Sequence, residues 1–228
     1  MTITAALRNF DIMYPEGNLF IRVPHGRLEA IVKEPVGQSS GAALVLHPLP
    51  TGGGTMHNKV VYRAASALNE AGLVTLRINF RGVGQSTGEF DAGKGELDDA
   101  RSALEYLSEQ YPNKPLVVCG FSFGARVGTE LGIPDRRVSY LISIGTPIDK
   151  YDFHLLQDCR KPILFVHGQE DEFGNASRLR EMVKKLEGKT RVKLIVISGA
   201  DHFFEGHLDE LKQAITSWMV ASLNKHND

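Results

Sequence analysis

Short apolar runs alternate with amphipathic stretches along most of this chain. Two runs near its start, Leu19 to Val23 and Arg27 to Lys33, are joined through His25-Gly26 and predict a β-hairpin. Later runs are apolar almost without interruption, which favours strands that are covered on both faces. They are Ala42 to Leu46, Val74 to Ile78, Leu116 to Cys119, Val138 to Ile144, Ile163 to Val166 and Val192 to Ile197.

The segments between these runs are amphipathic. In the clearest of them, Ala92 to Gln110, apolar residues recur at helical spacing with charged residues between them. Since strands and helices alternate from residue 42 onward, we expect an α/β fold with a mostly parallel central sheet and helices on both faces. The other predicted helices cover about Lys59 to Ala71, Asn175 to Leu186 and Leu208 to Leu223.

Length and composition narrow the class of protein. The chain has 228 residues, of which 42% are hydrophobic, and we expect one domain that spans residues 1–228. A net charge of -1 with no basic cluster gives no electrostatic footprint for nucleic acid or an anionic membrane. Neither a signal peptide nor a membrane span is recognisable, so we expect a soluble, cytoplasmic protein. A small, nearly neutral molecule is the expected partner; the oligomeric state stays open, and a homodimer is compatible with the sequence.

Neither the cysteines nor the glycine-rich segments predict a metal, cofactor or nucleotide site. Cys119 and Cys159 form no disulfide framework and no C-x-x-C pair, and Cys119 is expected to be a buried, inert thiol. Gly88 to Gly95 approaches the phosphate-binding pattern G-x-x-x-x-G-K-[S/T], but Gly95 stands where a hydroxyl must bind magnesium. The glycines at 82, 84 and 88 miss the dinucleotide spacing and are expected to shape a loop.

The segment from Leu116 to Gly128 carries the clearest chemical signal. Its apolar run stops at Gly120, and Gly120 to Gly124 satisfies G-x-S-x-G with Ser122 at the centre. In this pattern the serine takes a strained backbone conformation on a strand-turn-helix element, and the glycines leave room for strand and helix to approach. The turn would present the Ser122 hydroxyl and place the Phe123 N–H at a helix N-terminus, where it can donate to an oxyanion.

A serine hydroxyl is a weak nucleophile, so Ser122 needs a general base and the base needs a carboxylate to orient it. In a parallel sheet the site lies beyond the carboxyl ends of the strands. His202 follows the last predicted strand at that end and is the favoured base. His47 and His167 also follow strands, but each precedes a tight Pro or Gly turn and could equally shape its loop.

Three acidic residues, Glu170, Asp171 and Glu172, follow the strand that ends at Val166. Asp171 is the favoured orienting acid because the chain order Ser, Asp, His is the order of this type of fold. Asp201 is adjacent to His202, but neighbouring side chains in a loop point apart. We therefore expect Asp201 to form a turn or to be solvated.

With these motifs, the chain resembles the α/β-hydrolase superfamily, and within it the small lidless bacterial hydrolases related to dienelactone hydrolase and carboxylesterases. The match runs from the Ala42 strand to the Leu208 helix. Besides the G-x-S-x-G turn and the His202 loop, it rests on H-P-x-P at His47 to Pro50, G-G-x-M-x-N-K at Gly53 to Lys59, R-G-x-G-x-S-x-G at Arg81 to Gly88 and H-G-x-x-D at His167 to Asp171.

The resemblance implies that Ser122 is the nucleophile, His202 the base and Asp171 its orienter, with the N–H groups of Phe123 and Leu49 as the oxyanion hole. It also implies no lid domain, because only residues 145–162 connect the two strands between which larger members insert one. Two departures are visible. Dienelactone hydrolases use a cysteine nucleophile, and many members carry Asp where Asn79 opens the R-G-x-G loop, which leaves the hydrogen bonding of that loop open.

These features predict a serine hydrolase that cleaves small carboxylic esters through an acyl-enzyme, without a cofactor or metal. A thioesterase or acyl-peptide hydrolase with the same triad is an alternative, and so is a non-catalytic protein that uses the pocket to bind a ligand. Without a lid, short acyl chains of roughly two to six carbons are expected to be preferred. Four aromatic residues near the nucleophile and base either line a short apolar cleft or belong to the core: Phe121, Phe123, Phe203 and Phe204.

Overall fold

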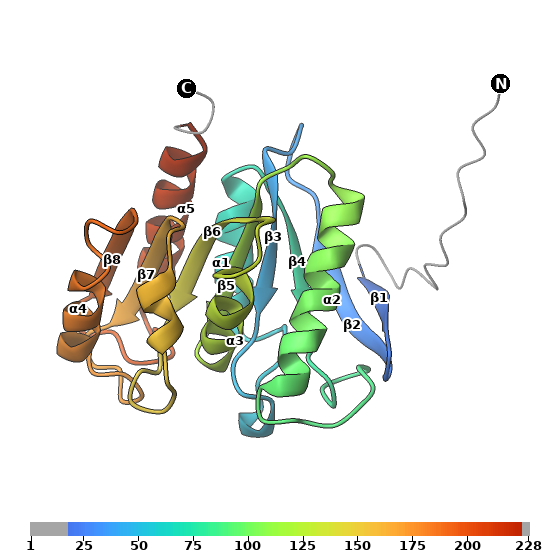
Figure 1. The fold of residues 1–228 in the computed structure, drawn as a ribbon, viewed down its shortest axis with the longest axis horizontal. Helices are drawn as coiled ribbons and strands as arrows, with labels where there is room; N and C mark the ends of the chain where they lie inside the picture. The colour runs from blue at the N-terminus through green and yellow to red at the C-terminus, as the bar shows by residue number, and fades with distance from the viewer. Residues whose placement is uncertain (1–17, 225–228) are drawn as a thin grey trace.

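The computed structural model describes residues 18–224, which form one eight-stranded sheet with helices on both faces (Figure 1). The strand order is β1-β2-β4-β3-β5-β6-β7-β8, and all pairs from β4 to β8 are parallel. The antiparallel pairs β1–β2 and β2–β4 add a hairpin at one edge. The strands are β1 Asn18–Val23, β2 Gly26–Lys33, β3 Gly41–Leu46, β4 Leu73–Ile78, β5 Leu116–Phe121, β6 Val138–Ile144, β7 Ile163–Gly168 and β8 Val192–Ile197.

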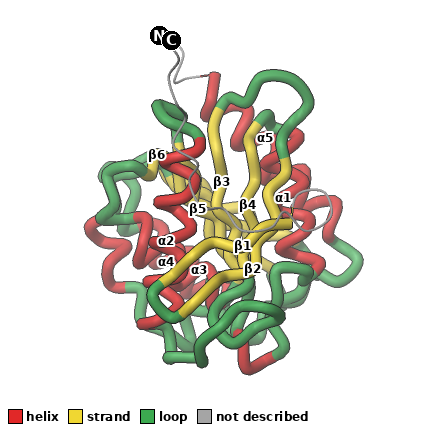
Figure 2. The backbone as a smooth tube through the Cα atoms, turned by 90° about the vertical axis from the view of Figure 1, so that its right-hand side faces the viewer, coloured by secondary structure: helices red, strands yellow, loops and turns green. Residues whose placement is uncertain are grey.

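Helices α1 and α5 cover one face of the sheet, and α2, α3 and α4 cover the other (Figure 2). Each face has its own apolar core. All six residues of β3 and of β5 are buried, as a continuous apolar run predicts for a strand between two layers. The helices are α1 Lys59–Glu70, α2 Lys94–Gln110, α3 Phe123–Gly132, α4 Ala176–Lys184 and α5 Leu208–Asn224, with short 3-10 helices η1 Pro50–Gly52 and η2 His154–Asp158.

Side-chain caps fix where two of the helices begin. The Asn58 side chain accepts a hydrogen bond from the Val60 N–H at the start of α1. The Asn175 side chain accepts from the N–H groups of Ser177 and Arg178 at the start of α4. Such caps satisfy N–H groups that have no acceptor within the helix, so the predicted starts of both helices are correct to within one residue.

The connection between β6 and β7 confirms the lidless architecture. Residues 145–162 contain only η2, which is far too small to be a lid domain. In the part of the chain that the structure describes, no helix is long and apolar enough to cross a membrane. The same part contains no group of three His, Cys, Asp or Glu residues that could hold a metal ion. Both cysteines are buried and free, and burial raises the pKa of the Cys119 thiol, which favours the inert form.

Candidate active site

Ser122 occupies the turn between β5 and α3, so the predicted strand, turn and helix are confirmed. Its backbone has φ 54° and ψ -116°. A non-glycine residue in such a conformation costs about 1–3 kcal/mol and needs its surroundings to hold it there. Glycines flank it because strand and helix approach closely: a Cβ on Gly120 would collide with the Gly124 carbonyl, and one on Gly124 would lie 2.5 Å from the Leu46 oxygen.

His202, from the loop after β8, lies directly against this serine. Its Nε2 is 2.9 Å from Ser122 Oγ, although 80 positions separate the two residues in the sequence. The residue is only 2% exposed, and its ring contacts three phenylalanine rings, Phe121, Phe173 and Phe203, at centroid distances of 5.0, 4.6 and 5.2 Å. Aromatic packing on several sides restricts the orientation of the imidazole.

Asp171, from the loop after β7, is hydrogen-bonded to the ring nitrogen of His202 that does not face Ser122. Its Oδ2 accepts a hydrogen bond from His202 Nδ1 at 2.7 Å, and its Oδ1 accepts from the N–H groups of Phe173 and Gly174. A carboxylate on Nδ1 keeps that nitrogen protonated, which leaves Nε2 as the acceptor for the serine hydroxyl. Asp201 faces elsewhere: its side chain accepts from the Glu205 N–H and forms a turn, as the sequence predicted.

The loop after β3 carries the second candidate oxyanion donor. In the described part of the chain, neither Leu49 N–H nor Phe123 N–H donates to a protein acceptor. Leu49 lines the same cleft as Ser122, and the prolines on either side of it have no amide hydrogen. Both N–H groups are therefore free to bind a ligand oxygen.

His47, which the sequence left as an alternative base, holds this loop in place. Its Nδ1 donates to the Pro48 carbonyl at 2.6 Å, and its Nε2 accepts from the Phe80 N–H at 3.0 Å. The residue is fully buried, and desolvation lowers the pKa of its imidazole from 6.5 to about 4. With both nitrogens bonded to backbone and no contact with Ser122, His47 is a structural histidine.

His167 has a related role beside the acid. Its Nε2 donates to the Gly174 carbonyl at 2.5 Å and lies 3.7 Å from Asp171 Oδ2. Burial lowers the pKa of His167, and its Nδ1 is buried without a hydrogen-bond partner. Since Gly174 N–H binds the Asp171 carboxylate, His167 braces the loop that presents this acid.

A cleft of about 420 Å³ opens beside Ser122 and His202. Of the four aromatics considered from sequence, only Phe203 lines it; Phe121, Phe123 and Phe204 are buried, so for these three the core alternative holds. The sequence analysis missed several lining residues, although they lie in loops after β3, β6 and β7, where a site was expected. The missed residues are Asn58, Pro147, Lys150, Tyr151 and Phe173.

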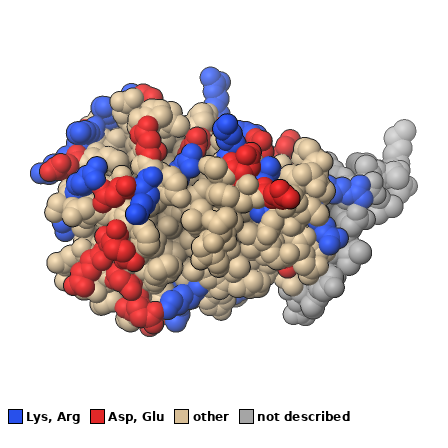
Figure 3. All heavy atoms as spheres, turned by 90° about the horizontal axis from the view of Figure 1, so that it is seen from below, with Lys and Arg blue, Asp and Glu red and all other residues tan. Residues whose placement is uncertain are grey.

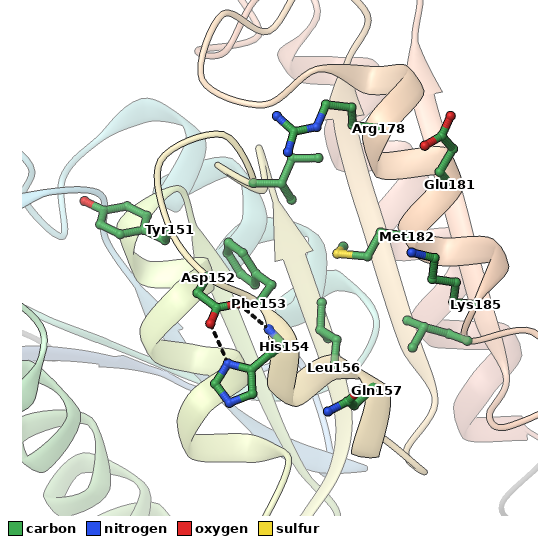
Figure 4. A pocket seen from close by; sticks show the side chains of 12 residues that line it. Tyr151, Asp152, Phe153, His154, Leu156, Gln157, Arg178, Glu181, Met182 and Lys185 are labelled. Carbon is green, nitrogen blue, oxygen red and sulfur yellow. Dashed lines mark hydrogen bonds and ion pairs between the residues drawn. The ribbon is translucent and has the colours of Figure 1, made fainter.

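The face that carries the carboxyl ends of the parallel strands has most of its charged side chains near the margins, and its middle is largely uncharged (Figure 3). A second cavity of about 440 Å³ lies between η2 and α4 (Figure 4). There Asp152 and His154 point toward one another at 2.7 Å. None of Ser122, His202 and Asp171 lines this cavity.

The loop after β4 also lies at the carboxyl edge of the sheet, but it does not line the cleft. Asn79 is buried there, donates to the Glu29 carboxylate at 2.8 Å and accepts from the Met56 N–H at 2.8 Å. An Asp at this position would place two carboxylates together, so the pairing with Glu29 explains the asparagine. The fully buried Asp99, which sequence reasoning missed, anchors the same loop through Arg81 and also binds His25.

Comparison with known proteins identifies relatives of this chain. Residues 44–222 match the sequence profile of a family described as an alpha/beta hydrolase domain. The chain is 35% identical over 220 residues to an uncharacterized protein of Rickettsia prowazekii, with 92% of each chain covered. It is 36% identical to an alpha-beta serine hydrolase homologue from Coxiella burnetii, with a TM-score of 0.83 over 90% of this chain and 98% of that one. A serine hydrolase without a lid from Xanthomonas campestris is also 36% identical, with a TM-score of 0.82 over 90% and 94%.

Proposed function

The chain belongs to the alpha/beta hydrolase domain family, and we propose that it is a serine esterase that cleaves small carboxylic esters through Ser122, His202 and Asp171. One observation carries the proposal: hydroxyl, imidazole and carboxylate form a continuous row with spacings of 2.9 and 2.7 Å. The three residues come from three separate loops at one edge of the sheet. A protein that only bound a ligand would not need all three in this arrangement.

In the proposed reaction, Ser122 Oγ attacks the ester carbonyl while His202 Nε2 takes the hydroxyl proton. The negative charge that develops on the carbonyl oxygen is stabilised by the free N–H groups of Leu49 and Phe123. His202 then returns the proton to the leaving alcohol, and an acyl-enzyme remains on Ser122. Water, activated by the same imidazole, releases the acid and restores the serine.

Asp171 supports the reaction through the His202 ring. Its carboxylate holds Nδ1 protonated and stabilises the imidazolium that forms when Nε2 accepts the proton. The N–H groups of Phe173 and Gly174 on its other oxygen keep the carboxylate oriented toward the ring. The general base is thereby held in the productive tautomer before substrate arrives.

The size and openness of the cleft favour short acyl groups. It measures about 420 Å³, its apolar walls include Leu49, Phe173 and Phe203, and no lid domain covers it in residues 18–224. A long acyl chain would extend past these walls into water and gain little further hydrophobic stabilisation. The cleft therefore suits an acyl chain of roughly two to six carbons.

A p-nitrophenyl ester series from acetate to laurate tests this function. We expect kcat/KM to be highest for acyl chains of roughly two to six carbons and to fall for longer ones. The Ser122→Ala variant, prepared identically, controls for contaminating esterases. Efficiency that keeps rising beyond about ten carbons would contradict the cleft argument. Turnover of acyl thioesters with no turnover of the matching oxygen esters would redirect the assignment to a thioesterase.

A further inference from the structure

The side chains that line the cleft beside Ser122 offer one positive charge and no carboxylate. Among the described residues that line it, Lys150 is the one Lys, Arg, Asp or Glu. Asp171 stays behind His202, where its side chain is fully buried, and so a ligand in the cleft cannot contact its carboxylate. A charged substrate in the cleft therefore has one charged lining side chain to pair with, the Lys150 ammonium.

Lys150 forms no ion pair in the part of the chain that the structure describes, although it has acidic neighbours. Asp149 pairs with Arg178 and accepts from the Asn175 N–H, while Asp152 accepts from His154. Both carboxylates are thus committed to other partners. The Lys150 ammonium lies 5.6 Å from the centre of the Phe173 ring, and that ring contacts His202. One aromatic ring separates the positive charge from the general base.

Asn58 adds a second donor to the same cleft. Its side-chain oxygen accepts from the Val60 N–H at 2.9 Å and caps α1. Exchanging the oxygen and nitrogen of the amide would break this cap, so its orientation is determined. The Nδ2 group is left to donate, and no described residue accepts from it. The polar side chains around the cleft thus present donors to a ligand that carries acceptors.

We propose that the cleft selects esters that carry a carboxylate in addition to the scissile bond, and that Lys150 binds that carboxylate with Asn58 as a second donor. This inference rests on the proposed function and adds the substrate class. Half-esters of dicarboxylic acids are the simplest members of the class. Their scissile carbonyl would sit at Ser122 while the chain passes along Phe173 to the ammonium group.

Two p-nitrophenyl esters test the proposal: the mono-p-nitrophenyl ester of adipic acid and the methyl p-nitrophenyl diester of the same acid. They share the scissile bond and the leaving group and differ in the terminal charge. The readout is the ratio of kcat/KM for the anionic ester to that for the neutral one. We expect a ratio of about five for the wild-type protein, because Lys150 is exposed and solvent weakens the pair. Raising the salt concentration to about 0.5 M should lower the ratio.

Three variants test whether Lys150 and Asn58 cause the preference for the anionic ester. Lys150→Gln should bring the ratio close to one, and Lys150→Glu should lower it about tenfold from the wild-type value. Asn58→Asp keeps a capping oxygen for α1 but replaces the donor with an anion, so it should also lower the ratio. Lys193→Glu is the matched control, since this exposed residue lies near the start of β8, away from the carboxyl edge, and should keep the wild-type ratio.

A wild-type ratio of one or less would overturn the inference, and so would a Lys150→Glu ratio within twofold of the wild-type value. Either result, with the neutral ester still hydrolysed in a Ser122-dependent way, would leave the esterase proposal standing. If the wild-type protein hydrolyses neither ester faster than Ser122→Ala does, the proposed function itself fails.

Discussion

The loops after β3 and β8 each carry a buried histidine with both ring nitrogens hydrogen-bonded, yet the two histidines have different surroundings. His47 is bonded to two backbone groups, the Pro48 carbonyl and the Phe80 N–H. His202 is bonded to two side chains, a carboxylate and a hydroxyl. Backbone partners fix a ring and its loop, whereas a carboxylate can stabilise the charge that a general base acquires.

The comparison shows that burial does not by itself make a histidine a base. Desolvation lowers the pKa of His47 to about 4, and among the described residues the hydrogen bond to the Pro48 carbonyl, not a carboxylate, opposes that effect. At His167 burial also lowers the pKa of the ring, although the nearby Asp171 charge partly opposes this effect. The charge and identity of the partners therefore separate the candidate base from the two structural histidines.

The largest expected effect is the loss of the candidate base or nucleophile. His202→Ala and Ser122→Ala should each lower kcat for a short ester by about a million-fold, and the double variant should be no worse than either. His154→Ala, at an exposed histidine outside the cleft, is the control and should retain activity. A folded His202→Ala protein within about tenfold of wild-type kcat would show that His202 is not the general base, and so that it does not differ from His47 in this respect.

A smaller effect is expected at the acid. Asp171→Asn should lower kcat about ten-thousand-fold, because an amide NH₂ facing His202 Nδ1 favours the wrong tautomer. Asp201→Asn and Glu170→Gln should remain near wild type, since neither carboxylate contacts the ring. Turnover of the three variants on one ester decides the assignment. If Asp201→Asn is the inactive variant, Asp171 is not the orienting acid.

The loop that His47 holds in place carries Leu49, whose N–H is the second candidate oxyanion donor. Leu49→Pro removes the free N–H and should lower kcat about a hundred- to a thousand-fold, the usual loss for one oxyanion donor. Leu49→Ala keeps the N–H and should change kcat only modestly. Circular dichroism establishes that both variants are folded. Similar rates for the two would mean that the second donor lies elsewhere, with residues 51–54 as the next candidates.

The smallest expected effect concerns stability and the charge of His47. Its folded pKa of about 4 lies below the unfolded value of 6.5, so between these values the unfolded chain binds a proton that the folded protein excludes. This contribution to stability is complete above about pH 6.5 and is lost as the pH falls toward 4. It amounts to about 2.5 kcal/mol of unfolding free energy between pH 7.5 and 4.5.

Urea denaturation at the two pH values measures this loss. We expect the decrease in unfolding free energy to be smaller in His47→Gln than in the wild-type protein, because glutamine does not titrate. If the variant does not fold, the ring of His47 can be titrated by NMR in the wild-type protein. If the His47 imidazole titrates above about pH 6, burial does not lower its pKa as described, and the contrast with His202 is wrong.

Much of this arrangement could be predicted from local patterns. The strand that ends at Leu46 and the turn at Ser122 are each specified by a few neighbouring residues. Parallel strands then bring their carboxyl ends to one edge, which is why His202 and Asp171 could be chosen without knowledge of their contacts. The strain at Ser122 was also predictable, since G-x-S-x-G leaves no other conformation for so close an approach.

What the sequence could not predict depends on packing between distant segments. Phe121 and Phe204 lie close to the candidate triad in sequence, yet both face the core, while Phe173 faces the cleft. All three residues are phenylalanines, so hydrophobicity does not distinguish them. The path of the backbone decides whether each ring faces the core or the cleft. The pairing of Asn79 with Glu29 likewise joins residues 50 positions apart.

Covalent labelling with a fluorophosphonate tests most directly whether Ser122 is an activated nucleophile. The purified protein is treated with the probe, digested, and the modified peptide is identified by mass spectrometry. We predict a single adduct on Ser122 in the wild-type protein, much slower labelling in His202→Ala and wild-type labelling in Asp201→Asn. An adduct on a different residue, or an unlabelled Ser122 in a preparation that hydrolyses short esters, would contradict the account.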